Sequence, residues 1–154
     1  PPFFRAVLAM QEVLTRFDFI WWPSYRFGQR LLLRSNGVSP AEVDSVMADR
    51  QKREILRAIY RPIMTASLRR PGLLIDGMQI EGLSADFVDQ LTPPTLIAHS
   101  KSDPMAPFDD AQWLAQNIPQ ARFLSVEDGG HVFFVVRSEQ VVPEITTFLE
   151  THAV

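Results

Sequence analysis

Apolar residues recur at helical spacing in the first half of the chain, between clear helix start and stop signals. Ser39 is followed by Pro40 and Glu42, so the serine can cap the Glu42 backbone N–H while the glutamate reaches back to the cap. The preceding pair Asn36-Gly37 is typical of a left-handed helix stop. Because no alternating strand pattern occurs here, residues 1–75 are predicted to be all helical.

Prolines and glycines divide this helical half and separate it from the rest. Pro62 is expected to interrupt or restart a helix, and Pro71-Gly72 is expected to end the next one. Residues 76–93 carry two glycines and a proline, and they are predicted to form a connecting loop with some short local structure.

The pattern changes after this loop, in residues 94–154. The run from Thr95 to Ser100 (TLIAHS) predicts a strand that is covered on both faces. A helix over 107–118 and a second strand over 121–126 follow, and apolar residues from Val141 to Leu149 predict a final amphipathic helix. This β-α-β-α order is typical of an α/β fold wound on a parallel sheet.

Composition places the chain among soluble globular proteins. Its 154 residues, 46% of them hydrophobic, are enough for a domain with a core, and no apolar run is long enough to span a membrane. Residues 1–70 hold 12 of the 15 Lys and Arg and 6 of the 18 Asp and Glu, a net charge of +6, so residues 71–154 carry −9. This shift suggests two sub-structures, with a solvated helix surface as the simplest source of the basic half.

Several classes of site and partner are not expected. Without cysteine there is no disulfide or thiolate metal site, the three histidines show no metal-binding pattern, and no phosphate loop or dinucleotide fingerprint is present. We therefore predict no metal and no cofactor, and the acidic total argues against nucleic acid. A membrane partner is not expected. Compartment and oligomeric state stay open, with a slight preference for the cytoplasm.

The residues that follow the two predicted strands are suited to acid–base chemistry. Asp103 comes shortly after the first strand, and Gly129-Gly130-His131 comes after the second. Since the carboxyl ends of parallel strands meet at one edge, this carboxylate could orient this imidazole as a general base. Ordinary turn roles are the alternative for both residues, and Asp128 is a weaker candidate for the acid.

The string PTLIAHSKSDPMAP, followed by GGH, resembles the C-terminal part of α/β-hydrolase-fold enzymes. The resemblance implies that Asp103 is the acid and His131 the base of a catalytic triad. It also implies a helical cap over residues 1–75 and the C-terminal part of the core domain over residues 94–154. Ser100 departs from the family pattern, which usually has glycine after the strand.

The nucleophile of such a triad has no candidate in this chain. The family's nucleophile elbow, G-x-S-x-G, does not occur, and the family order of nucleophile, acid and base would place it upstream of Pro1. Two parallel strands by themselves leave unpaired edges. We therefore expect an N-terminal half of the same hydrolase, as a separate chain or an unrepresented segment, to complete the sheet. Residues 94–154 are predicted to fold only with it.

A substrate pocket could be lined by side chains from both halves. The segment FDFIWWPSYRF is unusually aromatic, and it could line a lipophilic pocket, touch a membrane interface or pack as the core of the cap. His99 and Met105 lie close to the predicted acid in sequence. The candidate pocket residues are Trp21, Trp22, Phe27, His99 and Met105.

The sequence thus predicts a hydrolase that acts on a small or medium apolar ester, or a related acyl compound, through a nucleophile–His–Asp triad. Within the same fold, dehalogenases, epoxide hydrolases and C–C hydrolases remain alternatives, because they differ at the missing nucleophile. A non-catalytic protein that binds an apolar ligand or a protein partner through the aromatic cap is the alternative of a different class.

Overall fold

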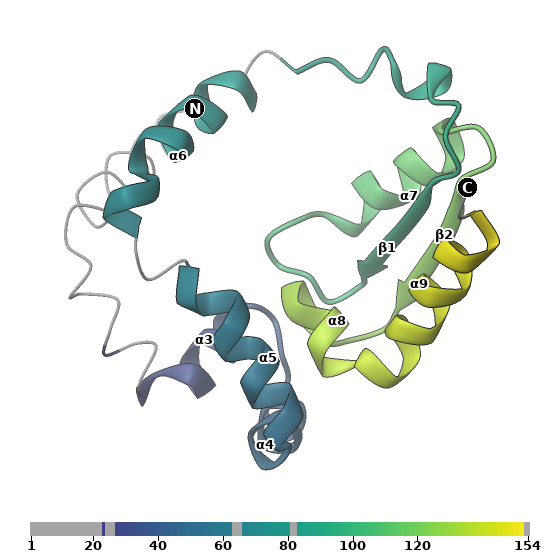
Figure 1. The fold of residues 1–154 in the computed structure, drawn as a ribbon. Helices are drawn as coiled ribbons and strands as arrows, with labels where there is room; N and C mark the ends of the chain where they lie inside the picture. Colours follow the sequence, from purple (N-terminus) through teal and green to yellow (C-terminus); the bar gives the residue numbers. More distant parts are fainter. Residues whose placement is uncertain (1–22, 24–26, 63–65, 81–82, 153–154) are drawn as a thin grey trace. The chain divides into compact units, whose positions relative to one another are not determined.

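The computed structural model describes residue 23 and residues 27–62, 66–80 and 83–152 (Figure 1). The chain divides into two compact units. The first comprises Pro1–Gln29 and Glu54–Leu83, and the second comprises Arg30–Arg53 and Ser84–Val154. The second unit therefore combines part of the predicted cap sequence with the whole of the predicted α/β part.

Helix α6 (Ala66–Ile80) is the longest described helix of the first unit. It runs through Pro71 and Gly72, so the prediction that this pair ends the helix is wrong. Interior proline costs about 3 kcal/mol and glycine about 1 kcal/mol in helix propensity, yet α6 continues through both residues for a further eight positions. Because α6 reaches Ile80, the predicted loop over 76–93 begins later, and it contains the short 3₁₀ helix η2 (Val88–Gln90).

The helix signals around residue 39 are confirmed. Helix α3 (Gln29–Ser35) is followed by Gly37 at a φ of 85°, and α4 (Pro40–Ala48) begins after the cap residue Ser39. The Glu42 N–H donates to Ser39 Oγ at 3.4 Å, and the Ser39 N–H donates to Glu42 Oε2 at 2.9 Å. Helix α5 (Arg50–Tyr60) follows and ends before Pro62, as expected.

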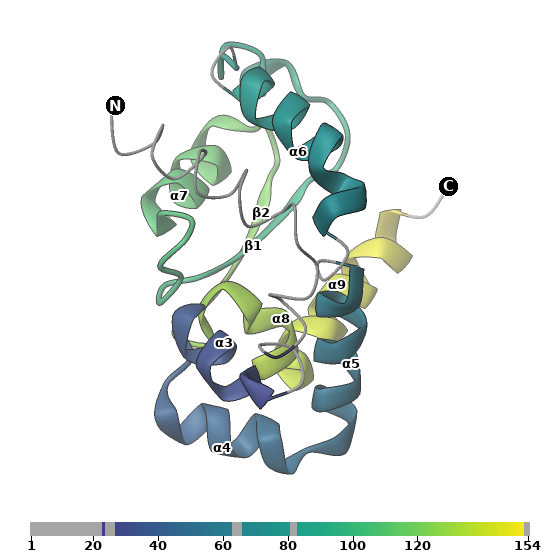
Figure 2. The ribbon, with the colours of Figure 1, turned by 90° about the vertical axis from the view of Figure 1, so that its left-hand side faces the viewer.

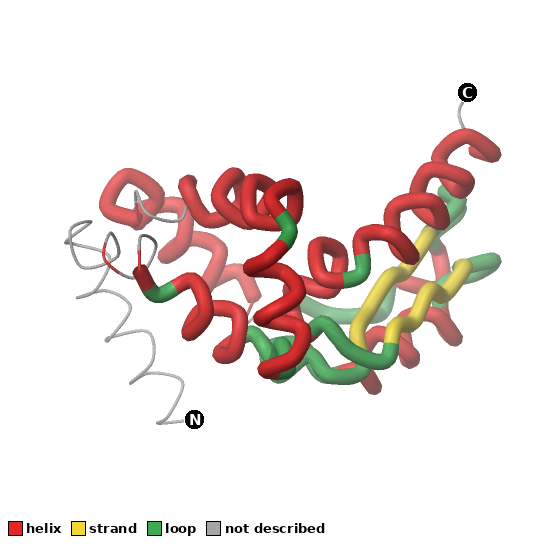
Figure 3. The backbone as a smooth tube through the Cα atoms, turned by 90° about the horizontal axis from the view of Figure 1, so that it is seen from below, coloured by secondary structure: helices red, strands yellow, loops and turns green. Residues whose placement is uncertain are grey.

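The C-terminal part of the second unit has the predicted order of strands and helices. Strands β1 (Leu96–Ser100) and β2 (Arg122–Val126) pair in parallel, with α7 (Phe108–Asn117) between them in sequence and packed against both (Figures 1 and 3). The 3₁₀ helix η3 (Gly130–Val132), α8 (Phe133–Val136) and α9 (Ser138–His152) follow. Asp109 and Asp110 lie in the first turn of α7, where carboxylates suit the helix dipole.

Two strands make up the sheet within the described part of the chain. The predicted cover on both faces of the first strand is not reached, since Leu96 to His99 are only half-buried and Ser100 alone is buried. The described chain supplies no further strand beside β1, which is the physical reason for this partial exposure.

The core of the second unit is built mainly from valines of the α4 and α8–α9 regions. Figure 2 shows α3 and α4 beside α8, and the backbone hydrogen bond from His131 N to Asn36 O, 2.7 Å long, joins the same two regions. The most deeply buried apolar side chains of the second unit are Leu33, Val38, Val43, Val46, Val126, Val132, Val135, Val136 and Val141.

No helix in the described ranges has both the length and the apolar character that a membrane crossing needs.

Candidate active site

The acid of the predicted pair lies in a tight turn after β1. Asp103 Oδ1 accepts the backbone N–H groups of Met105 at 2.8 Å and Ala106 at 3.2 Å. Both bonds are to Oδ1, so they hold the carboxylate in place while Oδ2 can accept a hydrogen bond from another group. The side chain is only 3% exposed, so this oxygen faces the protein interior rather than water.

The histidine lies in a loop after β2 that contains two glycines in left-handed conformations. Gly129 and Gly130 have φ values of 95° and 58°, a region that other residues rarely adopt. A Cβ atom on Gly130 would lie 1.9 Å from the Asn36 carbonyl oxygen. The close approach of the Asn36-Gly37 turn therefore requires glycine at position 130, directly before His131.

The structure brings the predicted acid and base together. His131 Nδ1 lies 2.9 Å from Asp103 Oδ2, and 47% of the His131 side chain is exposed. A carboxylate only accepts hydrogen bonds, so we assign the proton of the neutral ring to Nδ1. The unprotonated Nε2 can then accept a proton, which is the state a general base needs.

The pKa of Asp103 lies below its ordinary value. Burial raises this pKa, but the hydrogen bonds from His131, Met105 and Ala106, and the charge of a protonated His131, lower it more. Asp103 is therefore ionised at neutral pH, and its charge can stabilise an imidazolium on His131.

His99 lies against the same carboxylate. Its Nε2 is 3.8 Å from Asp103 Oδ2, its Nδ1 donates to the Ser100 carbonyl oxygen at 2.9 Å, and its ring meets Phe108 edge-on. The sequence placed His99 near the site, and this proximity is present. A role in lining a substrate pocket stays a prediction.

The other pocket candidates are spread over both units. Met105 is exposed beside the acid loop, and Phe27 is exposed in the first unit. Trp21 and Trp22 lie outside the described residues. Their shared role in a pocket stays a prediction.

Asp128 is not an acid partner of His131. Its carboxylate oxygens accept from Nε and Nη2 of Arg137, at 2.5 and 2.6 Å. The side-chain hydrogen bond with Arg137 is the main cause that holds the pKa of Asp128 below its usual range. The weaker candidacy of Asp128 as the acid is therefore wrong, because an arginine six positions beyond His131 binds it.

Sequence reasoning missed the residues that hold the two loops together. Ser102 and Asn36 contact the backbone of the histidine loop, at Gly130 N and His131 N respectively. For Ser102 the nearest signal was Ser100, which stands where the family usually has glycine, and Asn36 was singled out only as part of a helix stop. Across the ranges that the structure describes, no group of three or more His, Asp or Glu side chains could hold a metal ion.

Comparisons with known proteins show what the chain is similar to. Residues 79–154 match the family model of TAP-like proteins. A poly(3-hydroxyalkanoate) depolymerase of Ectopseudomonas oleovorans is 36% identical over 67 residues, which cover 44% of this chain and 23% of the relative. A pimeloyl-[acyl-carrier protein] methyl ester esterase of Nitrosomonas europaea is 27% identical over 100 residues, covering 63% of this chain and 39% of the relative.

A solved structure of a thermophilic esterase from Thermogutta terrifontis, with malate bound, has the same fold with a TM-score of 0.55 at 21% identity. The match covers 94% of this chain and 52% of the esterase chain.

The two parallel strands, the helix α7 packed against them and the match to the esterase structure define the chain as part of an α/β-hydrolase fold. The chain belongs to the α/β-hydrolase superfamily. It spans about half the length of the esterase structure and less than two fifths of each curated relative that it matches.

Proposed function

We propose that this chain forms the C-terminal half of an ester hydrolase, in which Asp103 and His131 activate a nucleophile outside residues 1–154. The observation that carries the proposal is the 2.9 Å contact between His131 Nδ1 and Asp103 Oδ2. Relatives named as esterases and a depolymerase support ester hydrolysis as the general chemistry.

The mechanism follows from the state of the two side chains. His131 Nε2 removes the proton of the nucleophile, usually a serine hydroxyl in this superfamily, as its oxygen attacks the ester carbonyl carbon. The imidazolium, stabilised by ionised Asp103, then protonates the departing alkoxide. In the second half of the reaction Nε2 takes a proton from water, whose oxygen attacks the acyl-enzyme, and returns it to the nucleophile as the acid leaves.

The remaining strands of the sheet come, in this proposal, from an N-terminal half of the same hydrolase. The half-buried residues of β1 support this, because a parallel strand is normally covered and paired on both sides. That half would carry the nucleophile and the oxyanion hole. The substrate is a small or medium apolar ester or a related acyl compound.

Hydrolysis of p-nitrophenyl esters by the full-length protein tests the proposal. His131→Ala should lower kcat by roughly 10⁴ to 10⁶, as removal of a triad base does elsewhere. His152→Ala is the matched control, because His152 lies exposed on α9 and its Nδ1 donates to the Phe148 carbonyl oxygen of the same helix. An unchanged rate in His131→Ala would remove this histidine from the mechanism.

A further inference from the structure

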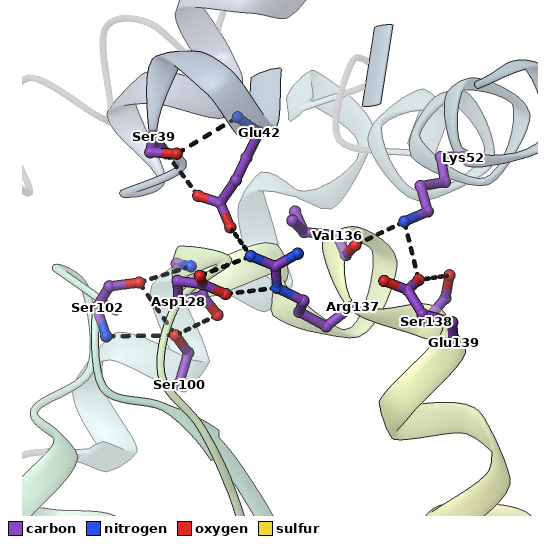
Figure 4. A network of polar contacts seen from close by, with 11 residues as sticks. Ser39, Glu42, Lys52, Ser100, Ser102, Asp128, Val136, Arg137, Ser138 and Glu139 are labelled. Carbon is purple, nitrogen blue, oxygen red and sulfur yellow. Dashed lines mark hydrogen bonds and ion pairs between the residues drawn. The ribbon is translucent and has the colours of Figure 1, made fainter. Parts of the chain in front are cut away.

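Polar side chains that take no part in the chemistry hold the histidine loop from two directions (Figure 4). Ser100 and Ser102 reach it from the acid loop, and Arg137 reaches it from the turn between α8 and α9. All of these contacts lie within the second compact unit.

The two serines form a directed series of hydrogen bonds. The Ser100 hydroxyl donates to the Asp128 carbonyl oxygen at 2.9 Å, so its single proton is used there. In the 3.1 Å contact between the two hydroxyls, Ser102 must then be the donor. Ser102 Oγ in turn accepts the Gly130 backbone N–H at 3.0 Å. Each hydroxyl thus both donates and accepts, and Ser100 is fully buried.

This arrangement links the residues that directly precede the acid and the base. Ser102 stands next to Asp103 in sequence, and Gly130 stands next to His131. A bond between Ser102 Oγ and Gly130 N therefore sets the separation of the two loops at the position where the carboxylate and imidazole meet.

Arg137 holds the same loop through the side chain of Asp128. The guanidinium binds both carboxylate oxygens of Asp128, and its Nη2 also donates to Glu42 Oε1 at 2.9 Å. Glu42 is 9% exposed, and its other oxygen caps α4 at Ser39. The planar guanidinium of Arg137 bonds both oxygens of Asp128 and is itself bonded to Glu42. It therefore fixes both the orientation of the histidine loop and its distance from α4.

We propose that Ser102 and Arg137 are positioning residues, which hold the loop Asp128–His131 so that the His131 ring meets Asp103. This inference rests on the proposed function. It deepens that function by assigning roles to two side chains that neither reach the imidazole nor bind the acid carboxylate.

The experiment uses the full-length protein and pairs each substitution that removes the polar group with a conservative substitution that keeps it. Ser102→Ala removes the acceptor for Gly130 N–H, whereas Ser102→Thr keeps a hydroxyl. Arg137→Met removes the guanidinium and its two bonds to Asp128, whereas Arg137→Lys keeps the positive charge. The controls are Ser138→Ala and Arg122→Met. The Ser138 hydroxyl donates to Glu139 and not to either loop, and Arg122 lies at the N-terminal end of β2, opposite the end that leads into the histidine loop, where it forms an exposed ion pair with Glu144.

Four quantities are measured: kcat and KM with a p-nitrophenyl ester, the melting temperature, and the pKa of Asp103 from the ¹³C shift of its carboxyl group. Ser102→Ala and Arg137→Met should each lower kcat by about 10- to 100-fold with little change in KM, as expected for a catalytic group misplaced by up to about 1 Å. The pKa of Asp103 should rise in both, because the hydrogen bond from His131 that lowers it is weakened. Ser102→Thr should restore kcat, Arg137→Lys should restore part of it, and the controls should behave as wild type.

The proposal is overturned if Ser102→Ala and Arg137→Met keep both the wild-type kcat and the wild-type pKa of Asp103. It is also overturned if kcat falls only in proportion to melting temperature, with no change in that pKa. Failure of the proposed function has a different signature, which is full esterase activity in His131→Ala. The Asp103 pKa would still report the position of His131 in that case.

Discussion

At the scale of single residues, backbone geometry at position 130 is as decisive as the titrating groups. The positive φ of Gly130 and the approach of the Asn36 carbonyl exclude any side chain there. The conformation places His131 over Asp103 and lets its N–H reach Asn36. One glycine therefore joins the α3–α4 turn to the candidate base.

Gly130→Ala should destabilise the protein and lower kcat, because the new methyl group would overlap the backbone of Asn36. The loss of stability should exceed about 2 kcal/mol, as for other overpacked and strained positions. Gly72→Ala is the matched control, since a Cβ there meets nothing within 4 Å and lies inside α6. That variant should gain about 0.5–1 kcal/mol of stability. Urea denaturation and the esterase assay check both, and equal stability in the two variants would contradict this account.

Asp103→Asn should lower kcat by about 10⁴, because an amide neither stabilises the imidazolium nor selects the Nδ1–H tautomer. The variant also tests the lowered pKa of Asp103. A carboxyl with a depressed pKa stabilises the folded protein at pH values above its ordinary pKa of 3.8, and this stabilisation disappears as pH falls through the lowered value. The stability difference between wild type and Asp103→Asn should therefore be constant near neutral pH and shrink in acid. Urea denaturation across pH 2–7 measures it, and a difference that grows in acid would contradict the assignment.

At the scale of elements, capping residues predict the limits of helices better than prolines inside a helical pattern do. The capping box at Ser39 and the glycine stop at Gly37 are present as predicted. Pro71 did not end α6, and α9 continues through Pro143 in the same way. Both prolines stand at the sixth position of their helices, where loss of one N–H bond leaves the rest of the ladder intact.

Ser39→Ala and Glu42→Ala should differ in cost although both residues belong to one capping box. Ser39→Ala should cost about 1 kcal/mol of stability, the usual value for a lost cap. Glu42→Ala should cost more, because Arg137 also loses a carboxylate partner that is mostly buried. Glu144→Ala, at the exposed pair with Arg122, serves as the control and should cost less than about 1 kcal/mol. Chemical denaturation of all three variants measures this order, and equal costs for Ser39→Ala and Glu42→Ala would show that the Arg137 contact contributes nothing.

At the scale of the whole molecule, the second unit presents a parallel sheet with too few strands for its apolar content. Residues of β1 that read as fully covered in the sequence are half-buried in the structure. The chain also spans only about half of the esterase structure that it matches. Both observations support the proposal that a further segment completes the sheet.

Addition of the segment that carries the remaining strands should therefore slow amide hydrogen exchange in β1, since paired and covered backbone groups open less often. The same protein without that segment should melt with low cooperativity. Hydrogen exchange and calorimetry on the two forms check this. A cooperative melt and a dispersed NMR spectrum from a monomer of residues 1–154 alone would contradict it.

The sequence by itself determined the strands, the α4 cap and the residues that follow each strand, because these depend on neighbours along the chain. It also predicted that Asp103 and His131 lie close together, since strands paired in parallel bring the loops after them to one edge of the sheet. Only the tertiary structure decided that Asp128 binds Arg137, that Glu42 completes this network from 95 positions away, and that Ser102 joins the two loops. Such contacts depend on how strands and helices pack in three dimensions, and short-range patterns carry no record of that packing.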